Sequence, residues 1–211
     1  MQYSESAQRA LAILRDSTHF EWYVVPIFGI VLYFYFIEIK QKNWNVIFAG
    51  LAYYGIEWLG EIANSLWMYS SGYAPLWGEP GKTAYLILVG INLETTLMFS
   101  IFGLAIAKLL PDDPKMKLWG VPNRVLVVFG LSLFCALVET VLNKFGALTW
   151  DYWWWGWPHI WSVILFAYAP ASAFTVVIHD MKSITKKALI LGVIYLLDVI
   201  LMVTFIQIGW I

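Results

Sequence analysis

Long apolar runs, separated by short polar stretches, occur six times along this 211-residue chain. A helix needs about 20 mostly apolar residues to cross the hydrocarbon core of a bilayer, and each run is long enough. The predicted transmembrane helices cover residues 20–39, 44–69, 84–109, 122–145, 158–179 and 187–210. We therefore predict an all-α fold: a polytopic integral membrane helical bundle, with residues 1–211 forming a single transmembrane domain.

The segment before the first predicted helix is more polar. Ala7, Leu11 and Leu14 recur at nearly helical spacing within residues 4–16, which predicts a short N-terminal interfacial helix. A frayed polar tail is the alternative. Charged residues interrupt the first 19 positions, so no cleavable signal peptide is expected.

The composition agrees with a membrane protein and excludes several other classes. Hydrophobic residues make up 61% of the chain and charged residues only 13%, which does not fit a soluble domain. The basic residues are scattered over short segments, so no nucleic acid partner is expected. Cys135 is the single cysteine, which excludes an intrachain disulfide and a metal site built from cysteines. No internal repeat is visible, so a transporter made of duplicated halves is not supported.

The basic residues orient the predicted bundle. By the positive-inside rule, the first, third and fifth connections are cytoplasmic, because most lysines lie in or beside them. Both termini and the second and fourth connections are therefore predicted on the non-cytoplasmic side. The basic residues on the predicted cytoplasmic side are Lys40, Lys42, Lys108, Lys115, Lys117, Arg124, Lys182, Lys186 and Lys187. Those on the other side are Arg9, Arg15, Lys82 and Lys144.

Acidic and amide side chains interrupt the apolar helices. Glu57, Glu61 and Asn64 are four and three residues apart, so they share one face of the second helix. From the helix rise of 1.5 Å per residue, the acidic groups lie roughly 9 to 18 Å from the predicted outer ends of their helices. Antiparallel helices would rarely bring carboxyl groups to a shared depth by chance. The predicted catalytic residues are Glu57, Glu61, Glu139, Glu94 and Asp198.

An ionised carboxylate at the bilayer centre costs about 2.5 to 3.5 kcal/mol on insertion scales, so several at one level need partners or protons. We interpret Glu57, Glu61 and Glu139 as lining an inward-facing polar cavity open or gated toward the outer side. The alternative is that such residues only fix helix packing through hydrogen bonds. That alternative stays open for Glu94, Asn143 and Asp198 taken singly.

A tryptophan-rich segment, WDYWWWGWPHIW at residues 150–161, lies on the same predicted side. It is typical of the aromatic belt at a membrane interface. Six tryptophans in twelve residues also fit an aromatic roof that excludes water and stabilises developing positive charge. His159 beside it is a candidate proton shuttle or an ordinary hydrogen-bonding residue. The predicted substrate-binding residues are Asn64, Asn92, Asn143, Trp58, Trp154, Trp155, Trp157 and His159.

Standard catalytic motifs are absent, including the nucleophile elbow, HExxH and phosphate-binding glycine loops. With three histidines, the chain lacks the ligands for a histidine-rich diiron hydroxylase. No cofactor is expected, although a divalent metal held by Glu57, Glu61, Glu139 and His159 is an alternative.

These features favour a membrane enzyme that performs acid–base chemistry on a lipid or isoprenoid-like substrate. In its size, and in the segment GIEW at residues 55–58, the chain resembles the small integral-membrane terpene cyclases. That resemblance covers one short segment and implies a cyclase-type reaction. Two alternatives stay open: a proton- or cation-coupled transporter or channel, and a cofactor- or pigment-binding membrane subunit. The expected partner is a membrane lipid or a hydrophobic small molecule.

Overall fold

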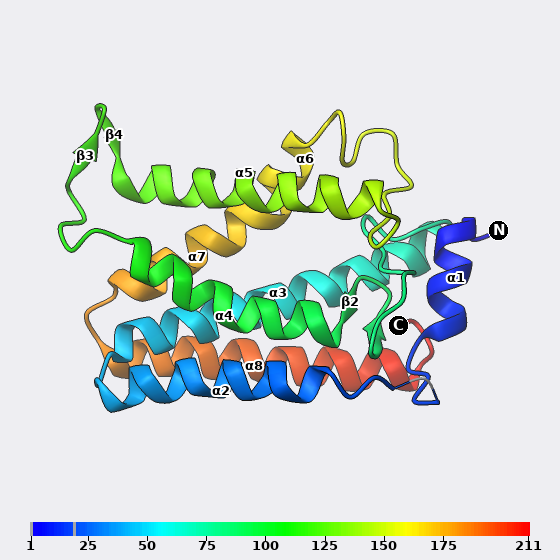
Figure 1. The fold of residues 1–211 in the computed structure, drawn as a ribbon, viewed down its shortest axis with the longest axis horizontal. Coiled ribbons are helices and arrows are strands. Elements are labelled where there is room, and N and C mark those ends of the chain that lie inside the picture. Colours follow the sequence, from blue (N-terminus) through cyan, green and yellow to red (C-terminus); the bar gives the residue numbers. More distant parts are fainter. Residues whose placement is uncertain (1, 19) are drawn as a thin grey trace.

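A computed structural model describes residues 2–18 and 20–211. Its long helices run along one common axis, and both termini lie at the same end (Figure 1). The helices are α1 (Glu5–Ile13), α2 (Val24–Lys40), α3 (Trp44–Ser71), α4 (Leu93–Leu109), α5 (Asn123–Lys144), α6 (Trp161–Val163), the π-helix η1 (Ile164–Tyr168), α7 (Ala169–Asp180) and α8 (Ile184–Gln207). Two short antiparallel hairpins complete the fold: β1 (Leu86–Leu88) with β2 (Ile91–Asn92), and β3 (Lys117–Leu118) with β4 (Val121–Pro122).

Four helical segments in the described part of the chain are long and apolar enough to cross a membrane: Trp44–Ser71, Asn123–Lys144, Trp161–Asp180 and Ile184–Gln207. The other two predicted spans correspond to α2 and α4, which have 17 residues each. At 1.5 Å per residue they are about 25 Å long, slightly less than a typical hydrocarbon core. The mostly helical membrane fold is thus confirmed, with four candidate spans where six were predicted.

The prediction of one helix over residues 84–109 is wrong in its first third. Residues 86–92 form the β1–β2 hairpin, and α4 begins only at Leu93. Asn92 ends the extended segment and caps the helix, because its side-chain oxygen accepts a hydrogen bond from the Thr95 backbone N–H at 2.8 Å. Apolar content alone does not separate a buried strand from a buried helix, which explains the error.

The N-terminal helix is present and lies across the end of the bundle (Figure 1). Ser4 caps α1 by accepting a hydrogen bond from the Ala7 backbone N–H at 3.2 Å. Ala7 and Ala10 are buried and pack with Met68 of α3 and Leu86 of β1. The helix therefore covers the same end that holds the β1–β2 hairpin.

Helix α3 is the centre of the bundle and contacts α2, α4, α7 and α8. Helices α3 and α4 approach each other closely at Gly103 of α4, which has no side chain. A Cβ on Gly103 would lie 2.8 Å from the Ala49 backbone oxygen and 2.6 Å from the Tyr53 Cβ. Small residues at such crossings let membrane helices approach closely. This packing holds α4 against the face of α3 that carries Tyr53.

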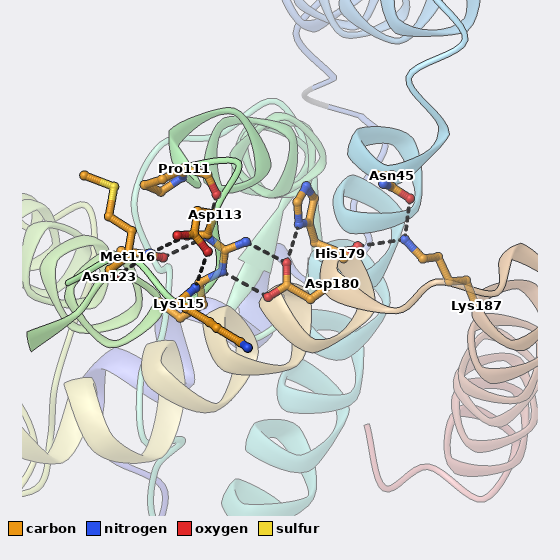
Figure 2. Close-up of polar contacts among 10 residues, drawn as sticks. Asn45, Pro111, Asp113, Lys115, Met116, Asn123, His179, Asp180 and Lys187 are labelled. Atoms are coloured by element: carbon orange, nitrogen blue, oxygen red, sulfur yellow. Dashed lines mark hydrogen bonds and ion pairs between the residues drawn. The ribbon is translucent and has the colours of Figure 1, made fainter.

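Polar contacts join several helices at the end opposite the termini (Figure 2). Arg124 of α5 donates to both carboxylate oxygens of Asp180 at the end of α7, at 3.0 and 2.8 Å. The fully buried Lys187 of α8 donates from Nζ to Asn45 Oδ1 at 2.7 Å and to the His179 backbone oxygen at 2.9 Å. Bidentate and charge-assisted bonds of this kind fix helix ends in register. They also hold α5, which lines the cavity described next, against the end of α7.

Candidate functional site

A cavity of about 320 Å³ lies between α3, α4, α5, η1 and the connection that follows α3. Its wall combines acidic side chains with a large aromatic and aliphatic surface. The lining residues are Tyr53, Glu61, Trp77, Glu79, Gly90, Asn92, Glu94, Thr95, Met98, Phe99, Phe102, Phe134, Cys135, Val138, Glu139, Leu142, Ala147, Leu148 and Tyr168. Three predicted catalytic residues, Glu61, Glu94 and Glu139, therefore meet at one site.

Glu61 projects from the middle of α3 and is almost completely buried. Its Oε1 atom accepts a hydrogen bond from the Trp77 indole at 3.0 Å. Its buried Oε2 atom has no hydrogen-bond partner among the described residues. Buried polar atoms usually have hydrogen-bond partners in proteins, so an oxygen left open in a cavity wall makes Glu61 a candidate for contact with a bound molecule.

Glu139 reaches the same cavity from α5. Its Oε1 atom accepts a hydrogen bond from the Tyr168 hydroxyl of η1 at 2.5 Å. Its Oε2 atom is also buried, and the buried indole nitrogen of Trp150 lies beside this carboxyl group. The π-helical turn that carries Tyr168 directly precedes α7, where Pro170 occupies the first turn. Because proline cannot donate a backbone hydrogen bond, it favours such a local change in helical register.

Glu57 lies one turn before Glu61 on α3 but is not part of the cavity wall. It is buried and within electrostatic range of Glu139 and of the Tyr53 hydroxyl. Its Oε1 atom has no hydrogen-bond partner within residues 2–18 and 20–211. Glu57 therefore lies close behind the cavity, next to Tyr53, which does line it.

Glu79 belongs to the site although its position in the sequence did not indicate this. It lies in the connection between α3 and β1, outside the membrane-spanning helices, and this connection folds back onto the bundle. Glu79 accepts hydrogen bonds from the Asn92 backbone N–H at 2.9 Å and from the Thr95 hydroxyl at 2.7 Å. Burial raises the pKa of Glu79 to about 8, and the nearby carboxyl groups of Glu139 and Glu94 act in the same direction.

This shift predicts that stability falls as pH rises from about 4.5 to 8, because the folded protein then keeps a proton on Glu79 that the unfolded chain releases. Glu79→Gln resembles the protonated acid and should remove part of this decline, which amounts to a few kcal/mol across the range. Thermal unfolding of both proteins in detergent between pH 5 and 9 measures it. Parallel curves for the two proteins would contradict the assignment.

Glu94 and Asn92 line the cavity at the start of α4, yet both have complete structural roles. Glu94 accepts hydrogen bonds from the Tyr23 hydroxyl, from the Thr83 hydroxyl at 2.7 Å and from the Ala84 backbone N–H at 2.9 Å. It thereby ties α2 and the connection before β1 to α4. Fully paired oxygens make Glu94 a weaker candidate for proton transfer than Glu61 or Glu139.

Asn64 and Asn143, predicted to bind substrate, instead hold loops and do not line the cavity. Asn64 Nδ2 donates to the Trp77 backbone oxygen at 2.7 Å, and its Oδ1 accepts from the Leu76 N–H at 2.7 Å. Asn143 donates to the Leu148 backbone oxygen at 3.1 Å. Asn64 thus places Trp77 where its indole reaches Glu61.

The tryptophan-rich segment lies around the cavity rather than in its wall. Trp155 stacks on Trp77 with ring centroids 5.8 Å apart, and Trp154 meets Trp155 edge-on. Trp157 and His159 are exposed, and the His159 ring contacts Trp153. Trp58 is partly buried against the core, meets the Tyr54 ring edge-on and does not line the cavity. The roof over the carboxyl groups is therefore Trp77, supported from behind by Trp155.

Asp198 of α8 is the one predicted catalytic residue that the fold places away from the others. It is buried near Tyr54 and Tyr195 and does not line the cavity. Neither of its carboxylate oxygens has a partner among the described residues. Sharing a depth in the membrane was not sufficient to bring it to the site, because its helix lies on the other side of α3.

A metal bound by Glu57, Glu61, Glu139 and His159 would need these side chains to converge. His159 is exposed at the molecular surface, so the structure does not bring it to the carboxyl groups. The described residues contain no group of three or more His, Cys, Asp or Glu side chains arranged to hold a metal ion.

The chain is similar to known proteins over nearly its whole length. Residues 4–207 match an uncharacterized membrane protein family. An uncharacterized protein from Archaeoglobus fulgidus is 42% identical over 202 residues, which cover 96% of each chain. No solved structure matches this chain. With its apolar helices and a family match of this extent, the chain belongs to this uncharacterized membrane protein family.

Proposed function

We propose that this protein is an integral membrane enzyme that performs acid–base chemistry on a neutral lipid or isoprenoid-like substrate. One observation carries the proposal. Glu61 of α3 and Glu139 of α5 both place buried carboxyl groups in the wall of one largely apolar cavity, and Glu61 Oε2 has no described partner. A pair of positioned carboxyl groups can donate and accept a proton in successive steps.

The charge of the wall favours a neutral substrate. Four carboxyl groups line the cavity, and the described lining includes no Lys, Arg or His. An anionic headgroup would meet only acidic partners here, and ionising all four acids together would be costly. The aromatic rings of Tyr53, Trp77 and Phe99 suit a substrate that becomes positively charged during the reaction.

The proposed reaction needs no oxidant, reductant or further reactant. A protonated glutamic acid transfers its proton to one carbon of a substrate double bond, so the π bond becomes a C–H bond and leaves a carbocation. A second carboxylate then removes a proton from a neighbouring carbon, and a new double bond forms. The net result is an isomerisation, or a cyclisation if another double bond attacks the cation first.

The segment GIEW supports this reaction type through its likeness to the membrane terpene cyclases. Glu57, the acid in that segment, lies behind the cavity wall next to Tyr53. We therefore assign proton transfer to the substrate to Glu61 and Glu139. Glu57 is assigned the role of a positioning residue that influences the same group of acids.

We further infer that the acidic cavity lies toward the non-cytoplasmic side. The α2–α3 turn, the β3–β4 hairpin and the α7–α8 turn share the end opposite the termini (Figure 1). Most lysines of the chain lie in or beside these three connections. Such residues favour the cytoplasmic side.

Solvent deuterium tests the proposal. The purified protein in lipid nanodiscs is incubated in D₂O with squalene or geranylgeraniol, and the recovered lipids are analysed by mass spectrometry. Reversible protonation of a double bond should place deuterium on carbon in one of these probes, at a rate proportional to protein concentration. Carbon-bound deuterium no higher than in empty nanodiscs would contradict the proposal.

A transporter remains the second candidate because buried carboxyl groups also carry protons or cations across membranes. Proteoliposomes with a pH-sensitive dye inside separate the two functions. Proton movement without deuterium on carbon would replace the enzyme proposal by transport.

A further inference from the structure

One side of the cavity wall is exposed to the surroundings of the protein. Met98 of α4 is 49% exposed, and Phe134, Val138 and Leu142 of α5 are 57%, 37% and 38% exposed. All four line the cavity. The three α5 residues are four residues apart, so they form one stripe along the helix. The cavity therefore reaches the outer surface between α4 and α5.

This opening is entirely apolar and lies within membrane-spanning structure. Residues Phe134 to Leu142 extend over about 12 Å of the α5 axis. Helix α5 is one of the four candidate membrane spans, and the stripe runs along the half of it that ends at Lys144. The border of the opening thus faces hydrocarbon, whereas the acidic groups lie on the inner walls.

We propose that a hydrocarbon chain of a membrane molecule enters the cavity sideways from the bilayer, between α4 and α5. Met98, Phe134, Val138 and Leu142 form this lateral opening. The occupant is a single apolar chain, because a charged or zwitterionic headgroup cannot cross an apolar border at this depth without losing its hydration. The headgroup, where there is one, stays at the membrane surface.

The lateral opening describes how the substrate of the proposed enzyme reaches the cavity. The identification of the inserted hydrocarbon chain as that substrate rests on the proposed function. The opening itself is a property of the cavity and can be tested without turnover. At the inner end of the cavity, Tyr168 and Glu139 would contact an inserted chain. Tyr168 is only 6% exposed, so a lipid reaches it only from within the cavity.

The test uses a phosphatidylcholine with a photoreactive diazirine near the end of one acyl chain, mixed into nanodiscs with the full-length protein. After illumination, tandem mass spectrometry locates the adducts. Adducts are expected on Tyr168 or Glu139 in addition to lipid-facing residues such as Leu133 and Leu137. The yield of adducts on these lipid-facing residues serves as the internal reference for labelling efficiency in every variant.

Val138→Trp should fill the opening and lower the cavity adducts at least fivefold relative to the lipid-facing ones. Val141→Trp is the matched control, since Val141 is on the same helix, 51% exposed and not part of the lining. It should leave the cavity adducts unchanged. Should Val138→Trp fail to fold, Phe134→Ala widens the opening and should raise the cavity adducts.

Adducts confined to lipid-facing residues in the wild type would overturn the lateral opening, as would cavity adducts that Val138→Trp or Phe134→Ala does not change. The outcome is independent of the enzyme proposal. Cavity adducts without deuterium incorporation would keep the opening and remove the reaction. Deuterium incorporation without cavity adducts would keep the reaction and remove this route.

Discussion

Glu61→Gln is expected to reduce deuterium incorporation about 10² to 10⁴-fold, the usual contribution of a positioned general acid or base. The glutamine oxygen can still accept the hydrogen bond that Trp77 now donates to Glu61 Oε1. The amide cannot transfer a proton at the position of Oε2, the atom without a described partner. The variant should therefore fold normally and lose only the chemistry.

The initial rate of deuterium incorporation in nanodiscs measures this effect, and thermal unfolding in detergent checks the fold. Glu21→Gln is the matched control, because Glu21 lies beside the connection before β1, where its backbone N–H donates to the Ala84 oxygen, and because its side chain is half exposed and does not line the cavity. It should retain the wild-type rate. A Glu61→Gln protein that is folded and retains the wild-type rate would exclude Glu61 as the acid or base.

Gly90→Ala is expected to damage both stability and activity. A Cβ at this position would lie 2.4 Å from Asn64 Nδ2, 2.6 Å from Glu61 Oε2 and 2.8 Å from Trp77 Nε1. These distances are shorter than any normal contact, and all three groups are buried or hydrogen-bonded. Overpacking of a well-ordered interior costs about 1 to 3 kcal/mol, so the unfolding midpoint should fall by several degrees.

Gly60→Ala provides the comparison, because a Cβ there meets nothing within 4 Å and the residue lies on the same helix as Glu61. Within a helix this change is neutral or slightly stabilising. Differential scanning fluorimetry of both variants, together with deuterium incorporation, separates a local clash from a general effect of a methyl group. Equal midpoints for the two variants would show that the hairpin does not press on Glu61.

The positions of the long helices could be predicted because a segment that crosses a membrane must be apolar over about 20 residues. Residues 44–69 and 122–145 were predicted as helices, and α3 and α5 occupy Trp44–Ser71 and Asn123–Lys144. The spacing of Glu57 and Glu61 also placed both on one stripe, which the α-helix enforces. Apolar length and helical period are properties of a single segment, so they can be read without the other segments.

The composition of the cavity wall was harder to predict. Glu79 and Trp77 lie in a loop without periodicity, and they reach the site only because the connection 72–92 packs back onto α3 and α4. The density of tryptophan in residues 150–161 pointed to rings that do not line the cavity, since Trp155 stacks on Trp77, which does line it. A loop's path depends on contacts distant in sequence, such as those of Asn64 with Leu76 and Trp77.

Hydrophobicity and helical period act within single segments, so they are enough to predict a mostly helical membrane protein with acidic groups inside its helices. Which of these acids share a site depends on how the helices pack together. Glu139 and Glu61 line one cavity because α5 packs against α7 and η1, whereas Asp198 lies apart because α8 approaches α3 from another side. Helix rotation and packing around α3 set these directions, and no single segment encodes them.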